Sequence, residues 1–156
     1  MRLGNELTRS TEMSSFKIFD IVGSGLSAQS VRLNTVASNL ANADSVSGDP
    51  STVYRARHPV FQAVRSAVAG QSSNPIDQMS GASVRVKGIV QSNAPPSERY
   101  EPGNPLADAN GNVYAPNVNV IEEMTDMISA SRAYQDNVEV LNTSKDLMLA
   151  TLKLGS

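Results

Sequence analysis

The stretch MTDMISASRAYQDNVEVLNTSKDLMLATLKLG, residues 124–155, has no proline and has glycine only at its last position. Its apolar residues return every three or four positions, which is the period of an amphipathic α-helix. Just before it, Asn119 is followed three residues later by Glu122, a spacing that resembles a capping box. We therefore predict a helix within residues 117–156. From 119 to 154 it would be about 54 Å long, too long for a compact domain of this size.

The apolar positions of this helix alternate spacings of four and three residues, which is the a/d pattern of a coiled coil. We call this set the C-terminal seam. It consists of Val120, Met124, Met127, Ser131, Tyr134, Val138, Leu141, Lys145, Met148 and Leu152. A seam of this kind predicts that the helix packs lengthwise against at least one other helix.

A matching pattern lies towards the other end of the chain. The N-terminal seam consists of Phe19, Val22, Leu26, Gln29, Leu33, Val36 and Leu40. The turn-forming residues ANADSVSGDP, 41–50, then end the helix. We expect an N-terminal helix within residues 13–48, preceded by a disordered extension over residues 1–12. The 3.5-residue repeat predicts that the two terminal helices pair as a left-handed coiled coil.

The middle of the chain, residues 49–116, is predicted to be a small β-rich domain. All eight prolines lie there, and proline is costly inside helices. The segment SVRVKGIV, 83–90, alternates valine with arginine and lysine, which is typical of a half-buried strand. The segment TVYRARHPVFQAV, 52–64, is a second candidate, broken by Pro59, and Asn110–Gly111 is a two-residue hairpin signal. The predicted fold class is therefore α+β.

Composition excludes several classes of protein. There is no cysteine, so disulfides and thiolate chemistry are excluded. The net charge is -2 with both signs dispersed, which argues against a nucleic-acid or anionic membrane surface. No apolar run reaches the roughly 18 residues of a membrane span, and no cleavable secretory signal is recognisable near the start. If the protein leaves the cytoplasm, we expect another route.

No catalytic, cofactor or metal site is predicted, and no small-molecule substrate is expected. His58 is the one histidine and has no serine or cysteine partner at a recognisable spacing. The segment DANGN places its glycine at position 4, whereas an EF-hand loop requires it at position 6. Glu122 and Glu123 are better explained as a first helical turn that suits the helix dipole than as an acid/base pair.

Two interpretations of the seams remain open. In one, they close an intramolecular two-helix hairpin, as in a monomeric coiled-coil adaptor. In the other, they face further subunits, which the predicted helix length and the thin middle domain favour. A subunit of the second kind would have loose terminal helices until it assembled. An enzyme would need a pocket with converging ionisable groups, and the sequence offers none.

Three segments carry a resemblance to a known family. The segments FDIVGSGLSAQSVRLNTVASNLANADS, 19–45, and PNVNVIEEMTDMISASRAYQDNVEVLNTSKDLML, 116–149, closely resemble the two ends of proximal-rod proteins of the flagellar axial family. The segment YEPGNPLADANGNVY, 100–114, resembles the part before their terminal helix. The SNLAN element, 38–42, resembles a signature shared by flagellar axial proteins, whereas residues 1–12 have no counterpart in the pattern, and Met13 fits the ordinary start.

The resemblance implies a structural subunit of the proximal rod of the flagellar basal body. Such subunits are exported unfolded by the flagellar type III apparatus, without a cleavable signal peptide. Their terminal helices line a tube that crosses the periplasm and transmits torque. The expected partners are other copies of the chain, other rod proteins and the export apparatus. The expected subunit interface comprises Phe19, Val22, Leu26, Leu33, Val36, Leu40, Val120, Met124, Met127, Tyr134, Val138, Leu141, Met148 and Leu152.

Overall fold

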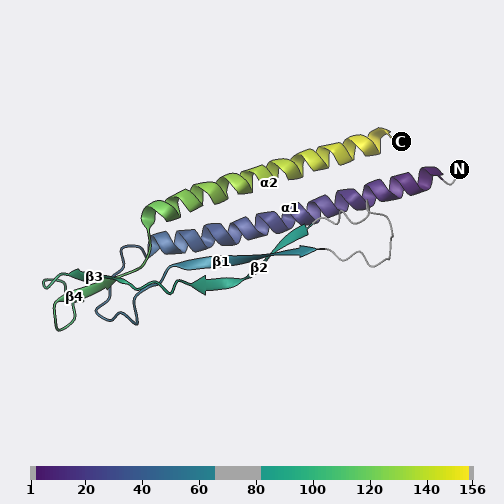
Figure 1. Cartoon of the computed structure of the whole chain (residues 1–156). Helices are drawn as coiled ribbons and strands as arrows, with labels where there is room; N and C mark the ends of the chain where they lie inside the picture. The colour runs from purple at the N-terminus through teal and green to yellow at the C-terminus, as the bar shows by residue number, and fades with distance from the viewer. Residues whose placement is uncertain (1–2, 66–81, 155–156) are drawn as a thin grey trace. The chain divides into compact units, whose positions relative to one another are not determined.

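The structure is a computed structural model, and it describes residues 3–65 and 82–154 of the chain. Among these residues the element order is α1, β1, β2, β3, β4, α2 (Figure 1). The two helices are the first and last elements, and the strands lie between them in the sequence, so the predicted α+β class is confirmed. None of the described helices combines the length and apolar character that a membrane crossing requires.

Helix α1 spans Leu3–Ala41. It therefore includes residues 3–12, for which the sequence predicted a disordered extension, and it ends before residue 48. The early start is compatible with the local sequence, because residues 3–12 hold no proline and half of them are good helix formers: Leu3, Glu6, Leu7, Arg9 and Glu12. At the other end, Asn42 N–H donates to the Asn39 carbonyl at 3.2 Å, which is the tight turn expected of a helix terminus.

Helix α2 spans Val120–Leu154. Its predicted cap is confirmed, since the Asn119 side-chain oxygen accepts a hydrogen bond from Ile121 N–H at 3.1 Å. Glu122 and Glu123 occupy the first turn, where carboxylates stabilise the positive end of the helix dipole.

The strands form two small sheets. Strand β1, Arg57–Arg65, pairs with β2, Ala82–Gln91, which contains the predicted segment 83–90. The sequence predicted that Pro59 interrupts the strand candidate at 52–64, yet β1 continues through Pro59. A two-stranded sheet has only edge strands, and an edge strand tolerates a residue without an N–H group.

Strand β3, Ser97–Tyr100, pairs antiparallel with β4, Asn112–Ala115, and Ser97 lies opposite Ala115. The hairpin prediction at Asn110–Gly111 needs correction, because these residues close a longer connection rather than a two-residue turn. The Asp108 carboxylate accepts hydrogen bonds from the N–H groups of Asn110 and Asn112, both at 2.8 Å, and so builds a wider turn.

The chain divides into two compact units, each of which includes part of both helices. The first unit comprises residues 1–29, 61–85 and 132–156, and the second comprises 30–60 and 86–131. In the first, Val22 and Ala28 are buried. In the second, the buried apolar residues are Val36, Val53, Ala56, Val113, Ala115 and Ala130. The apolar cores described in both units are small, so hydrogen bonds between polar groups contribute more to holding the segments in place.

Loop contacts hold the second unit together around these small residues. Ser47 and Tyr114 exchange two backbone hydrogen bonds, which attaches the segment after α1 to β4. Asn117 accepts a hydrogen bond from Ala56 N–H and donates one to the Ala94 carbonyl, both at 2.8 Å. The segment that leads into α2 is thereby fixed to the segment that leads into β1.

Candidate assembly surface

The N-terminal seam is mostly covered within the single chain. Val22 and Val36 are buried, whereas Phe19, Leu26, Leu33 and Leu40 are half-buried. Gln29, the polar member, has a buried side-chain oxygen without a hydrogen-bond partner among the described residues.

The C-terminal seam divides into two groups. Met127, Val138, Leu141 and Met148 are half-buried. The remaining apolar members are exposed: Val120 at 42%, Met124 at 53%, Tyr134 at 37% and Leu152 at 59%. Burial of apolar area stabilises by roughly 25 cal/mol per Å². Covering these exposed side chains would therefore add stability that the single chain does not have.

The two buried positions of the described part of α2 are polar or small, and two further polar residues continue their seven-residue spacing, a pattern that the sequence prediction did not include. Glu123 and Ala130 are buried, and Asn137 and Ser144 are half-buried, so the four follow one another at seven-residue intervals. In the first unit the Asn137 side chain lies against Gly25, where an added Cβ would be 3.2 Å from Asn137 Nδ2. In the second, Glu123 accepts a hydrogen bond from Asn39. The heptad spacing of small and polar residues was the signal that could have revealed this face.

Asn39, within the SNLAN element, is fully buried and joins several segments of the second unit. Its Nδ2 donates to the Arg57 carbonyl at 2.9 Å and to Glu123 Oε1 at 2.8 Å. Its Oδ1 accepts from Arg57 N–H at 2.9 Å and from the Tyr54 hydroxyl at 2.8 Å. In the sequence, Asn39 stands out only as part of a family signature, and nothing there predicts this role.

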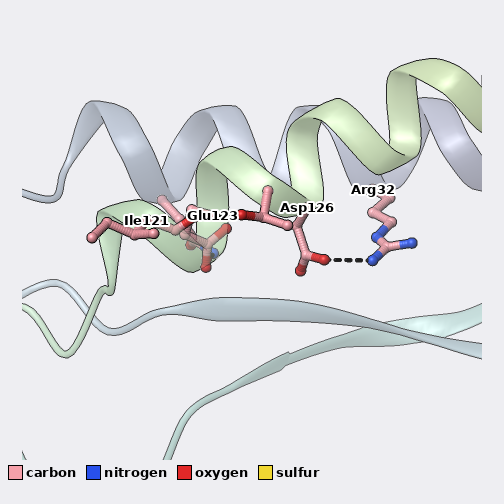
Figure 2. Close-up of polar contacts among 6 residues, drawn as sticks. Arg32, Ile121, Glu123 and Asp126 are labelled. Carbon is pink, nitrogen blue, oxygen red and sulfur yellow. Dashed lines mark hydrogen bonds and ion pairs between the residues drawn. The ribbon is translucent and has the colours of Figure 1, made fainter.

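A second polar contact between α1 and α2 lies nearby. Arg32 Nη2 donates to Asp126 Oδ1 at 2.7 Å, the dashed contact of Figure 2. The two side chains are 30% and 47% exposed, so solvent screens the pair and its contribution to stability is small.

Apolar side chains gather on the exposed side of the first turns of α2. Val120, Ile121, Met124 and Ile128 are all exposed, Ile121 most of all, and we call this set the α2 apolar patch. Figure 2 shows Ile121 at the start of α2, beside Glu123, whose carboxylate is engaged by Asn39. Contiguous exposed apolar side chains are a feature of surfaces at which proteins contact one another, whereas single ones are ordinary.

The described residues offer little for chemistry. No group of three or more histidine, aspartate or glutamate side chains among them could hold a metal ion. His58 is exposed on β1. In the loop after α1, the Asp49 carboxylate accepts hydrogen bonds from Ser51, and these bonds hold the pKa of Asp49 below its ordinary value. The same hydrogen bonds stabilise a turn. Among the described residues, the features of note are therefore the exposed and buried faces of the two helices.

Comparison with known proteins gives consistent matches at both ends of the chain. Residues 19–48 match a family model described as flagella basal body rod protein. Residues 109–154 match one described as flagellar basal body rod FlgEFG protein C-terminal.

Individual relatives match over nearly their whole length. The chain is 54% identical to flagellar basal-body rod protein FlgC of Salmonella typhimurium, and 55% identical to that of Yersinia enterocolitica. It is 39% identical to FlgC of Buchnera aphidicola from Schizaphis graminum. In each case the match covers 92% of this chain and 99% of the relative.

Proposed function

The chain belongs to the flagellar basal-body rod protein family, and we propose that its terminal helices polymerise it into the proximal rod, the shaft that transmits torque. It is a structural subunit of the flagellar basal body. The observation that carries the proposed mode of assembly is the exposure of apolar seam residues on α2, which a neighbouring subunit would cover.

We assign the subunit interface to both seams. Its residues are Phe19, Val22, Leu26, Leu33, Val36, Leu40, Val120, Met124, Met127, Tyr134, Val138, Leu141, Met148 and Leu152. Each exposed apolar side chain of this size that becomes fully buried contributes roughly 1.5–3 kcal/mol, so the gain comes from the exposed members, whereas Val22 and Val36 are already buried within the single chain. An assembly in which many helices meet therefore gains far more than a single hairpin.

The two helices also pair within the subunit as a coiled coil in this proposal. The contact of Gly25 with Asn137 in the first unit supports close packing of the two helices. The contact of Asn39 with Glu123 in the second unit supports pairing through the same face of α2. Residues 13–48 and 117–156 then form the assembly domain, and 49–116 form a small outer domain. Residues 1–12 have no part in the interface.

The proposed partners are other copies of this chain, other rod proteins and the flagellar type III export apparatus. The subunit would cross the inner membrane through that apparatus, without a cleavable signal peptide, and reside in the rod within the periplasm. We propose no enzymatic role, since the relatives carry the names of structural rod proteins.

Replacing Met124 with aspartate tests the interface. Met124 is exposed in the single chain, so Met124→Asp leaves the subunit folded but places a charge in the assembled contact, at a cost of several kcal/mol. In a Salmonella strain that lacks its own FlgC, the unmodified chain should restore swimming. Met124→Asp should be exported yet build no rod, as judged by electron microscopy of isolated basal bodies.

Ser129→Asp is the matched control. Ser129 is also exposed on α2 but lies outside the seam, so this variant should swim. Normal swimming by Met124→Asp cells would contradict the proposed interface.

A further inference from the structure

Residues of α1, β1 and β2 line a groove of about 290 Å³ in the second unit, which we call the α1–sheet groove. Val31 and Ile89 are its apolar members, and the other lining residues are Asn34, Thr35, Ser38 and Arg57. One water molecule requires only roughly 10–15 Å³ of such space. The groove is therefore large enough to receive an aliphatic side chain.

The rim of the groove is positively charged. Arg57 lines both the groove and a neighbouring polar pocket, and Arg55 lines that pocket as well. The Arg57 guanidinium lies over the Tyr54 ring, 5.3 Å from the ring centroid, and this cation–π contact helps to hold it there. The described residues that line the two hollows include no aspartate or glutamate. The groove therefore suits an apolar side chain that has a carboxylate beside it.

The α2 apolar patch, in the same unit, has the complementary character. Ile121 is its most exposed member, at 77%, so it does not fill the groove of its own chain. The adjacent Glu122 is also exposed, and within residues 3–65 and 82–154 its carboxylate takes part in no ion pair. A second copy of the chain thus offers the combination of groups that the groove suits.

Two copies could use the patch in two different ways. Contact of patch with patch would bring the Glu122 carboxylates of the two copies towards each other, and like charges across a contact are destabilising. It would also close a pair, because both copies would use the same surface. Contact of patch with groove pairs opposite charges. It leaves one patch and one groove uncovered, so the same contact repeats from copy to copy.

We propose that the α2 apolar patch of one copy docks into the α1–sheet groove of a second copy of this chain. Ile121 then lies between Val31 and Ile89, and Glu122 lies against Arg57. Such a head-to-tail contact builds a row of copies rather than a closed dimer. The inference rests on the proposed function, because it names the partner that covers this part of the assembly surface.

Cross-linking between introduced cysteines tests the contact directly, because the chain has no cysteine of its own. Ile89→Cys and Ile121→Cys are combined in one chain, which is produced in the Salmonella strain that lacks its own FlgC. Isolated basal bodies are then treated with a short bis-maleimide. We expect covalent dimers and larger oligomers of this chain, since each copy takes part in one contact through its patch and in another through its groove.

The two single variants separate the alternatives. Neither should give dimers of the chain, because each contact would then contain one cysteine. Dimers of Ile121→Cys alone would show that patch meets patch. Cross-linking of Ile121→Cys to a different rod protein alone would assign the patch to that protein. Either result, or the absence of cross-links from the double variant in assembled rods, would overturn the proposal.

A charge exchange tests Arg57 and Glu122 without cysteines, and it decides the matter if the double cysteine variant builds no rod. Arg57→Glu keeps the backbone hydrogen bonds with Asn39 but brings like charges together, so the number of rods should fall at least about tenfold. Adding Glu122→Arg restores opposite charges and should recover most of the rods. The ion pairs among the described residues do not join Arg57 to Glu122 within one chain, so recovery reports a contact between copies.

His58→Glu is the matched control, because His58 is exposed on the same strand and does not line the groove. This variant should build rods. An equal loss in His58→Glu, or no recovery when Glu122→Arg is added to Arg57→Glu, would contradict the docking. If the unmodified chain builds no rod, the proposed function fails. The same cross-linking of the concentrated, purified chain then still decides whether patch and groove meet.

Discussion

Gly48 lies so close to the connection between β3 and β4 that a side chain does not fit there. An added Cβ would lie 2.5 Å from the Leu106 carbonyl oxygen, a backbone atom that cannot rotate away. Gly111 is constrained differently, because its φ of 82° favours glycine. Two residues without side chains thus shape the loops that support the second unit.

Gly48→Ala should destabilise the protein by about 1–3 kcal/mol, the range typical of overpacking, because the loop backbone must shift. Urea denaturation followed by circular dichroism measures the loss. Gly103→Ala is the control, since an added Cβ at Gly103 meets nothing within 4 Å. Equal stability of the two variants would show that the loop yields without cost.

At the scale of elements, two polar contacts attach the first turns of α2 to α1, and burial separates their importance. The Arg32–Asp126 pair is partly exposed, so water and salt weaken it. The Asn39–Glu123 contact lies among buried atoms, where an unpaired polar group costs about 1–3 kcal/mol. The buried contact is therefore the one that defines how α2 attaches.

Arg32→Met should lower the free energy of unfolding by less than about 1 kcal/mol, and the difference should shrink in high salt. Denaturation at low and high ionic strength measures it, with Asp126→Asn and the double variant completing a mutant cycle. A loss above about 2 kcal/mol that persists in salt would mean that Arg32 supports the fold by packing rather than by charge.

At the scale of the whole molecule, the single chain leaves apolar surface on α2 that its own residues do not cover. Ile121, Leu147 and Leu152 are 77%, 63% and 59% exposed. Exposed apolar residues are ordinary when single, but along one helix of a rod-family protein they are best explained by neighbouring subunits.

Leu141→Asp should block assembly without blocking export. Leu141 is half-buried in the C-terminal seam, and an aspartate there costs several kcal/mol in an apolar contact unless it protonates or finds a partner. Lys145, one turn further along α2, would relieve part of that cost. Swimming and the secreted amount of subunit measure the two effects.

Asn142→Asp is the neighbouring control, because Asn142 is exposed and lies outside the seam. Cells with Asn142→Asp should swim. If cells with Leu141→Asp swim equally well, the C-terminal seam is not a packing surface.

The sequence by itself determined that a helix lies towards each end, the cap at Asn119, the strand within 83–90 and the resemblance to the family, but not that α1 begins at Leu3. These features depend on local spacing, local hydrogen bonding and motif identity, which are all readable along the chain. It did not predict β1 running through Pro59, because tolerance of proline depends on a strand being at an edge.

Only the tertiary structure decided which face of α2 turns inward in each unit. The buried positions are Glu123 and Ala130, and the half-buried Asn137 and Ser144 follow them at seven-residue intervals; this small or polar set carries no apolar signal. The Asn137 side chain lies close to Gly25, where the helix carries no side chain. The buried Asn39 amide requires a hydrogen-bond acceptor, which Glu123 provides. Such needs arise only when distant segments meet, because a polar group removed from water must find its hydrogen bonds within the fold.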